Sequence, residues 1–424
     1  MARWNTIARG TAFAAAATLA LAACSSGGTT PTPTATNTGG DGTVTDTPLL
    51  VGSLLPITGS LAFLGPPEVA GVDLAIKDIN DAGGVLGAPV TADHTDSSDA
   101  DNPTIASASV DKMISDGVGA IVGAASSSVS LNVVDTVAAA SVVQISPANT
   151  STALSGYSPF YFRVAPPDTI QGDVMGKLLL DDGKKKIGIL VFNEDYGTSL
   201  RDVITKTVTG GGGEIVYGKS GQEFDPKASN FSSDVQSVLA ASPDAVVVIA
   251  FDQTKQILPE LLSAGFPTKD IYMVDGNTAD YSADFEPGTL EGIQGTIPGA
   301  FPAKDFQDRL NSVAPEPLTS FAYGPESYDS TILVALAAEK GGATDGATIQ
   351  KNLAAVSGAT GGEDCASFAD CVALIKAGKE INYQTVAGSG SFNSDNDPSS
   401  AFIGIYLFDG NNVPQWQKAV EGQI

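Results

Sequence analysis

The sequence has few basic residues and only one histidine, and these shortages exclude several classes of function. Lys and Arg total 22 against 48 Asp and Glu, which gives a formal net charge of -26. A surface this acidic repels nucleic acid and anionic lipid headgroups, so we expect no nucleic-acid partner. The single histidine, His94, leaves a zinc site or a Ser-His-Asp triad short of its usual residues. We therefore expect no metal, no cofactor and no catalytic residue.

The apolar stretch near the N-terminus is too short to span a bilayer, which takes about 20 apolar residues. Two arginines precede this stretch, Thr11–Ala23, and Cys24 follows it. The ending Leu21-Ala22-Ala23-Cys24 resembles a lipobox, at which a bacterial signal peptide is removed and the cysteine is acylated. We expect residues 1–23 to be a lipoprotein signal peptide and Cys24 to carry the lipid. Ordinary secretion with a chance cysteine is the alternative.

A segment of Ser, Gly, Thr, Pro and Asn follows Cys24 and extends to about residue 48. Such a composition cannot bury a hydrophobic core, so we predict that residues 24–48 are the lipidated cysteine and a flexible linker. Because the acidic surface does not bind anionic lipids, the attached lipid would hold the protein to the membrane. The predicted location is the outer face of the cytoplasmic membrane.

Cysteine is scarce, and the chain has three, an odd number for an exported protein. If Cys24 is acylated, Cys365 and Cys371 remain, and they lie close together in the sequence. In an oxidising compartment such a pair is expected to form a local disulfide. A metal site is the alternative, and the shortage of histidine disfavours it.

From residue 49 onward, short β-branched runs alternate with helical stretches, which predicts parallel sheets covered by helices on both faces. The body is too long for one such sheet and suits two lobes. We predict strands at residues 49–54, 89–93, 119–122, 142–146, 186–192, 214–217, 245–250, 271–274 and 401–408. We predict helices near 66–82, 103–116, 129–140, 169–182, 198–209, 228–241 and 253–264, and a helical segment from 299 to about 388.

A series of motifs in this body resembles the type I periplasmic binding proteins, in particular the leucine/isoleucine/valine-binding proteins of ABC importers. The match covers nearly all of residues 49–410, and the order and spacing of the motifs make it specific. The motifs are Pro56-Ile57-Thr58-Gly59-Ser60-Leu61-Ala62, Gly83-Gly84-Val85-Leu86-Gly87, Ser126-Ser127-Ser128, Ile145-Ser146-Pro147, Arg163 with Asp168 and Gln171-Gly172, and Asp195-Tyr196-Gly197.

The resemblance implies a fold of two α/β, Rossmann-like lobes that are joined by a three-crossover hinge and close over a small ligand. On this basis we assign residues 49–167 and about 299–395 to the N-terminal lobe. Residues 168–298 and about 396–424 form the C-terminal lobe. We expect a monomer.

Two polar turns in the first lobe are candidate ligand-binding segments. Ser127 lies between a predicted strand and helix, where free N–H groups and a hydroxyl suit a carboxylate. The next strand ends in a turn that contains Ala148 and Thr150. Because open α/β sheets bind ligands at the carboxyl ends of their strands, we predict that these three residues contact the ligand. A serine N-cap with no ligand is the alternative.

The second half of the predicted site depends on the resemblance. Asp275 aligns with the acidic residue that pairs with the ligand ammonium in that family, a strong interaction once desolvated. Tyr196 and Tyr323 align with the aromatic positions that flank the ligand. The alternatives are an ordinary Asx-turn for the aspartate and interior packing for the tyrosines.

The resemblance implies the substrate-binding lipoprotein of an ABC importer, with an amino acid as ligand and the permease subunits as partners. The ligand is expected to be a branched-chain amino acid or a related small molecule. A ligand-sensing protein of the same fold that reports to a signalling partner is the alternative, and a structural surface lipoprotein is a third.

Overall fold

The computed structural model describes residues 47–423. Cys24, the predicted signal peptide and almost all of the predicted linker lie outside these residues, so lipidation stays a prediction. Within residues 47–423, no helix combines the length and the apolar character that a membrane span needs.

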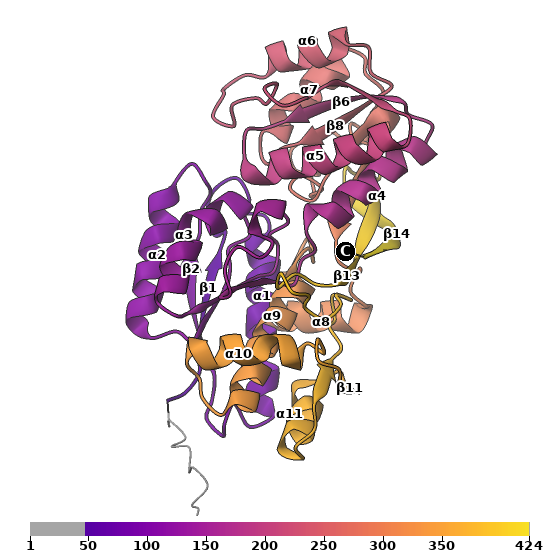
Figure 1. Ribbon diagram of the computed structural model, residues 1–424. Helices are drawn as coiled ribbons and strands as arrows, with labels where there is room; N and C mark the ends of the chain where they lie inside the picture. The colour runs from indigo at the N-terminus through magenta and orange to yellow at the C-terminus, as the bar shows by residue number, and fades with distance from the viewer. Residues whose placement is uncertain (1–46, 424) are drawn as a thin grey trace, which may run out of the picture. The chain divides into compact units, whose positions relative to one another are not determined.

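The first lobe is built on a parallel five-stranded sheet with the strand order β2-β1-β3-β4-β5. Helices α2 and α3 cover one face of this sheet, and α1 packs with α9 on the other (Figure 1). Because β3 and β4 are covered on both faces, every residue in them is buried. The elements are β1 (Leu50–Leu55), α1 (Gly65–Asp81), β2 (Thr91–Asp96), α2 (Pro103–Asp116), β3 (Ala120–Gly123), α3 (Ser127–Ala139), β4 (Val143–Ser146), a 3₁₀ turn (Thr152–Leu154) and β5 (Tyr161–Arg163).

The second lobe is built on a seven-stranded sheet with the order β14-β13-β10-β9-β8-β6-β7. Its strands from β10 to β7 are parallel, and β13 and β14 add an antiparallel edge. Figure 1 shows α4 and α5 on one side of this sheet and α6 and α7 on the other. The elements are α4 (Asp168–Asp181), β6 (Lys186–Val191), α5 (Asp195–Gly210), β7 (Glu214–Tyr217), α6 (Ser232–Ala240), β8 (Ala245–Ile249), α7 (Thr254–Ser263), a 3₁₀ turn (Thr268–Asp270), β9 (Ile271–Met273), β10 (Gln294–Pro298), β13 (Ser400–Phe408) and β14 (Pro414–Gln423).

The segment between β10 and β13 packs back on the first lobe, so the chain passes between the lobes three times. The central helix of this segment, α9, is buried along almost its whole length and lies against α1. Gly71 of α1 makes this approach possible, because a Cβ there would lie 2.2 Å from the carbonyl oxygen of Gly324. The elements are α8 (Lys304–Val313), α9 (Gly324–Gly341), α10 (Gly346–Val356), β11 (Glu363–Cys365), α11 (Phe368–Lys376) and β12 (Ile381–Tyr383).

The predicted two-lobed α/β fold with mainly parallel sheets is confirmed, whereas some element predictions are wrong. The second strand is β2, Thr91–Asp96, and not residues 89–93, because its register is set by pairing with β1. Strands β5, β10 and β14 were not predicted, nor were β11 and β12 inside the segment predicted to be helical. The exact boundaries predicted for the two lobes stay a prediction.

Cys365 and Cys371 form a disulfide that joins β11 to the first turn of α11. Both cysteines are buried, and they pack with the core of the first lobe. Closing a loop of this length removes conformational freedom from the unfolded chain.

We expect replacement of both cysteines by alanine to lower the free energy of unfolding by about 2 kcal/mol. Urea denaturation of the oxidised protein and the double variant measures this difference. Ligand affinity should not change, since neither cysteine lines the cavity described below. Free thiols at both positions in the purified, unreduced protein would contradict the assignment.

Candidate ligand-binding site

A small cavity lies where the carboxyl ends of strands from both sheets face each other. Five of the six residues predicted from the sequence line it: Ser127, Ala148, Tyr196, Asp275 and Tyr323. The other lining residues are mostly apolar: Leu61, Leu64, Ala125, Ser126, Phe251 and Gly276. The predicted turns after β3 and β4 therefore come together with the turns after β6, β8 and β9.

The carboxylate of Asp275 is the centre of a buried hydrogen-bond network. The Tyr196 hydroxyl donates to Oδ1 at 2.6 Å, and the Tyr323 hydroxyl donates to Oδ2 at 2.6 Å. Nε2 of Gln171 on α4 also donates to Oδ1, at 2.8 Å. Burial raises the pKa of Asp275, and these three hydrogen bonds oppose the rise because they stabilise the carboxylate. The network thus holds a hydrogen-bonded carboxyl group at the wall of the cavity.

Aromatic and aliphatic side chains form the rest of the wall. The Tyr196 ring stacks on Phe251, with centroids 5.6 Å apart and planes 10° from parallel. Leu61 and Leu64 of the first lobe pack into the same hydrophobic cluster as the core of the second lobe. The cavity therefore offers apolar surface around one acidic group, and no lysine or arginine lines it.

The beginning of α3 supplies the polar groups of the first lobe. Ser126 is the N-cap residue, and its hydroxyl accepts a hydrogen bond from the N–H of Val129. The Ser127 hydroxyl accepts from the N–H of Ser151 at 3.2 Å, so its own proton is left to donate to a ligand. A helix N-terminus with a hydroxyl donor is suited to a carboxylate.

A buried arginine fixes the turn after β4, a role that sequence reasoning did not assign. Nε of Arg163 pairs with Asp397 at 2.6 Å, and both side chains are almost completely buried. Its Nη1 donates to the carbonyl oxygens of Asn149 and Ser151 at 3.3 and 2.8 Å. The turn that carries Ala148 is thus held by a residue from β5 and a residue from the third crossover.

Thr150, the sixth predicted residue, does not line the cavity. It is completely buried, and its Oγ1 has no hydrogen-bond partner within residues 47–423. Its carbonyl accepts a hydrogen bond from the N–H of Asp168, the first residue of α4.

Asp168 is a buried acidic residue beside this site that was not among the predicted site residues. It begins α4, three residues before Gln171, so both side chains lie on one face of the helix. Within residues 47–423, neither of its carboxyl oxygens has a hydrogen-bond partner. Burial raises its pKa to about 7, the nearby hydroxyls of Ser199 and Thr150 oppose the rise, and the charge of Asp275 adds to it.

The lobes touch each other around the cavity. The N–H of Asp195 on α5 donates to the Ser128 hydroxyl at 3.2 Å, and the N–H of Thr152 donates to the Ser199 hydroxyl at 2.9 Å. The cavity between them has a volume of about 20 Å³, which is room for a water molecule and not for an amino acid. Entry of an amino acid therefore requires the lobes, or the side chains between them, to move apart.

Comparison with known proteins agrees with this fold and site. A family model described as periplasmic binding protein matches residues 48–369. The chain belongs to this family. The proteins of this family are binding proteins, and the fold is that of binding proteins. Within residues 47–423, no three His, Cys, Asp or Glu side chains are grouped as metal ligands.

Individual relatives have related names. A chemotactic signal transduction system substrate-binding protein, BasB, from Halobacterium salinarum is 25% identical over 375 residues, which is 85% of this chain and 87% of BasB. A leucine-, isoleucine-, valine-, threonine- and alanine-binding protein from Pseudomonas aeruginosa is 28% identical over 68% of this chain and 78% of its own length. The crystal structure of a branched-chain amino acid transporter substrate-binding protein from Streptococcus pneumoniae, in complex with isoleucine, superposes with a TM-score of 0.72 at 22% identity. That superposition covers 89% of this chain and 100% of the other.

Replacing Asp168 with asparagine should stabilise the protein without added ligand at alkaline pH. Because the folded-state pKa is raised, the carboxyl is neutral in both states at low pH, and stability is lost as the pH rises through about 7. We expect the variant to gain about 2–4 kcal/mol near pH 8 and little near pH 4. Urea denaturation at both pH values measures the gain.

The matched control is Asp305→Asn, since Asp305 is exposed on α8. Its effect should be small at both pH values. A gain for Asp168→Asn that is equal at both pH values would show that this carboxyl does not titrate as a buried group.

Proposed function

We propose that this protein is the extracytoplasmic substrate receptor of an ABC importer and that it binds an amino acid, of branched-chain type or closely related, in the cavity between the lobes. The observation that carries the proposal is the buried carboxylate of Asp275 opposite the N-terminus of α3. These two groups offer a negative and a positive partner across one apolar cavity.

The proposed binding mode follows from this polarity. The ligand ammonium pairs with Asp275, and Asp168, whose pKa burial raises to about 7, adds negative potential nearby when it is ionised. The ligand carboxylate contacts the first turn of α3 and the Ser127 hydroxyl. The aliphatic side chain of the ligand packs against Leu61, Leu64 and Phe251.

Closure of the hinge would couple binding to recognition by a permease. The groups around Asp275 come from several segments, because Tyr196 belongs to α5 of the second lobe whereas Tyr323 precedes α9, which packs on the first. A ligand that contacts both lobes binds the closed arrangement better than the open one, and therefore shifts the population toward it.

Family membership supports an extracytoplasmic location, and we propose that a lipid on Cys24 anchors the protein there. The anchor would keep the binding domain close to the permease at high effective concentration. The Pseudomonas aeruginosa relative, whose name gives five small amino acids as ligands, supports an amino acid as the ligand.

A sensing role is the second candidate. The observation that favours it is the similarity to BasB over 85% of this chain, since that protein is named as part of a chemotactic signal transduction system. Both roles use the same cavity and the same ligand chemistry. They differ in the partner protein that recognises the closed form of this protein.

The proposal predicts that Asp275→Asn weakens amino-acid binding by about 2–5 kcal/mol, because the ammonium loses its charged partner in a desolvated site. A thermal-shift screen of the twenty amino acids first identifies the ligand that raises the melting temperature most. Titration calorimetry then gives the affinity of that ligand for the protein and the variant. Asp305→Asn is the control, and its affinity should match that of the unmodified protein.

The 2-hydroxy acid analogue of the ligand sharpens the test, since it keeps the carboxylate and side chain but lacks the ammonium. It should bind the unmodified protein weakly, and Asp275→Asn should leave its affinity nearly unchanged. An amino acid that binds the variant as tightly as the unmodified protein would rule out Asp275 as the ammonium partner.

A further inference from the structure

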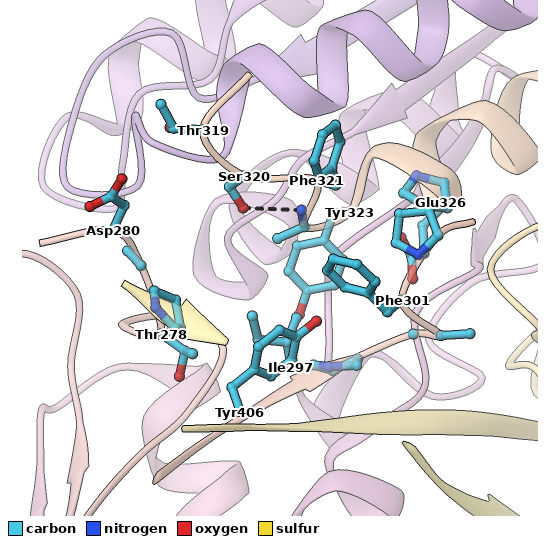
Figure 2. A pocket seen from close by; sticks show the side chains of 18 of the residues that line it. Thr278, Asp280, Ile297, Phe301, Thr319, Ser320, Phe321, Tyr323, Glu326 and Tyr406 are labelled. Carbon is cyan, nitrogen blue, oxygen red and sulfur yellow. Dashed lines mark hydrogen bonds between the residues drawn. The ribbon is translucent and has the colours of Figure 1, made fainter. Parts of the chain in front are cut away.

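A second, larger cavity lies on the other side of Tyr323, which lines both. Its volume is about 140 Å³, against about 20 Å³ for the first. Segments that are distant in sequence form it: the loop after β9, the chain that follows β10, the turn before α9, and β13 with the start of β14. Figure 2 shows the rings of Phe301, Tyr323 and Tyr406 close together at the centre of this cavity.

Four aromatic side chains line the second cavity: Phe301, Phe321, Tyr323 and Tyr406. Phe301 meets Tyr406 edge-on, with ring centroids 6.4 Å apart, and stacks on Trp416 at 5.9 Å. Phe301 and Trp416 are each 42% exposed, which is unusual for side chains of this size. The Phe301 ring lines the cavity and offers a face to which an organic cation is attracted, and Trp416 stacks on Phe301 without lining the cavity.

The only fully buried acidic group that lines this cavity is Glu326, in the first turn of α9. Its side chain is 2% exposed, and no side chain within residues 47–423 donates a hydrogen bond to its carboxyl group. The carboxyl lies against the backbone of Gly299, where a Cβ would be 2.1 Å from Oε1. Gly299, with φ of 98°, thus leaves the space that the carboxyl occupies.

We propose that this cavity is a second binding site, for a small organic ammonium ion that carries one apolar group. Glu326 is the counter-ion of the ammonium, and Phe301 and Tyr406 form the wall for the apolar group. The site is separate from the amino-acid cavity, and the inference does not rest on the function proposed for that cavity.

Size and charge select this class of ligand. A cavity of about 150 Å³ holds a benzene molecule, so a single six-membered ring with a short amine fits. No lysine or arginine lines the cavity, and Asp280 is its other acidic residue, so a carboxylate has no partner there. The net charge of -26 also concentrates cations near the surface.

Binding at this site is coupled to protons. Burial raises the pKa of Glu326 well above its usual value, and the charge of Asp329 raises it further. Glu68 of α1 is also buried, has no hydrogen-bond partner, and its pKa is raised in part by Glu326. Burial and the charge of Glu326 raise the pKa of Tyr406 of β13, and Asp280 lies at the other side of the cavity from Glu326 (Figure 2). Because all these neighbours are neutral or acidic, a bound cation favours the ionised form of Glu326, and affinity is expected to rise with pH.

The test is titration calorimetry of the full chain with benzylammonium chloride, and with benzoate and benzyl alcohol as ring-matched controls. We expect benzylammonium to bind and benzoate not to bind. Glu326→Gln should weaken benzylammonium binding by about tenfold or more, since a charged partner is lost. Glu316→Gln, at an exposed glutamate, should leave it unchanged. In the unmodified protein, affinity should rise with pH, and this dependence should vanish in Glu326→Gln.

A second variant keeps the result interpretable if Glu326→Gln perturbs folding, which circular dichroism would show. Phe301→Ala changes an exposed ring, so the fold should persist while benzylammonium affinity falls severalfold. The proposal is overturned if benzylammonium does not bind at millimolar concentration, if benzoate binds equally well, or if Phe301→Ala has no effect. It is also overturned if Asp275→Asn abolishes benzylammonium binding, because the amine would then lie in the amino-acid cavity.

Discussion

The arrangement of the two lobes depends on one buried carboxylate, that of Asp275. An ionised carboxylate at this depth is costly unless donors surround it, and its three donors come from α4, α5 and the turn before α9. Each donor therefore fixes the position of one segment relative to the others. Tyr323 shows the strength of this requirement, since its backbone adopts a left-handed conformation, with φ of 59°, that is rare for an aromatic residue. The Tyr323 hydroxyl donates its hydrogen bond to Asp275 while the backbone holds this conformation. A ligand ammonium that takes over part of this network would act directly on the contact between the lobes.

The ion pair between Arg163 and Asp397 is a second contact that fixes the segments around the candidate site. It connects the third crossover to the turn after β4. Asp397 lies in the segment that leads into β13, while Arg163 ends β5. Their contact holds the carbonyl groups of the turn after β4, so the crossover and this candidate ligand-binding turn are fixed to each other. In the proposed hinge mechanism, this connection would link ligand contact directly to movement of the lobes.

The parts of the fold that follow from local sequence were predictable, and the parts that depend on distant partners were not. The strand β8 is a run of buried β-branched residues, which is typical of a central parallel strand. By contrast, β14 is polar and mostly exposed, and it is a strand because β13 offers it an edge. The same distinction applies to the site. Turns at strand ends can be recognised along the chain, so Ser127 and Ala148 were predicted. The roles of Asp168 and Arg163 depend on residues that are far away in sequence or on burial, and motif spacing alone could not assign them.

A group of buried polar atoms without hydrogen-bond partners lies behind the cavity. These atoms lower the stability of the protein without ligand, and the proposed binding mode would offset that loss. Thr150, Asp168 and Gln171 each have buried oxygen atoms without a hydrogen-bond partner, and such atoms normally destabilise a folded protein. They lie together where the first crossover enters α4, beside the proposed ammonium position. Other buried polar atoms without a partner within residues 47–423, such as those of Glu68 and Thr205, lie in other parts of the fold, whereas these three residues border the candidate site. A cation at that site would improve the electrostatic environment of all three residues, so the same groups that weaken the protein without ligand would strengthen the complex. In the proposed binding mode, stability given up at this point would become differential affinity for the liganded, closed arrangement.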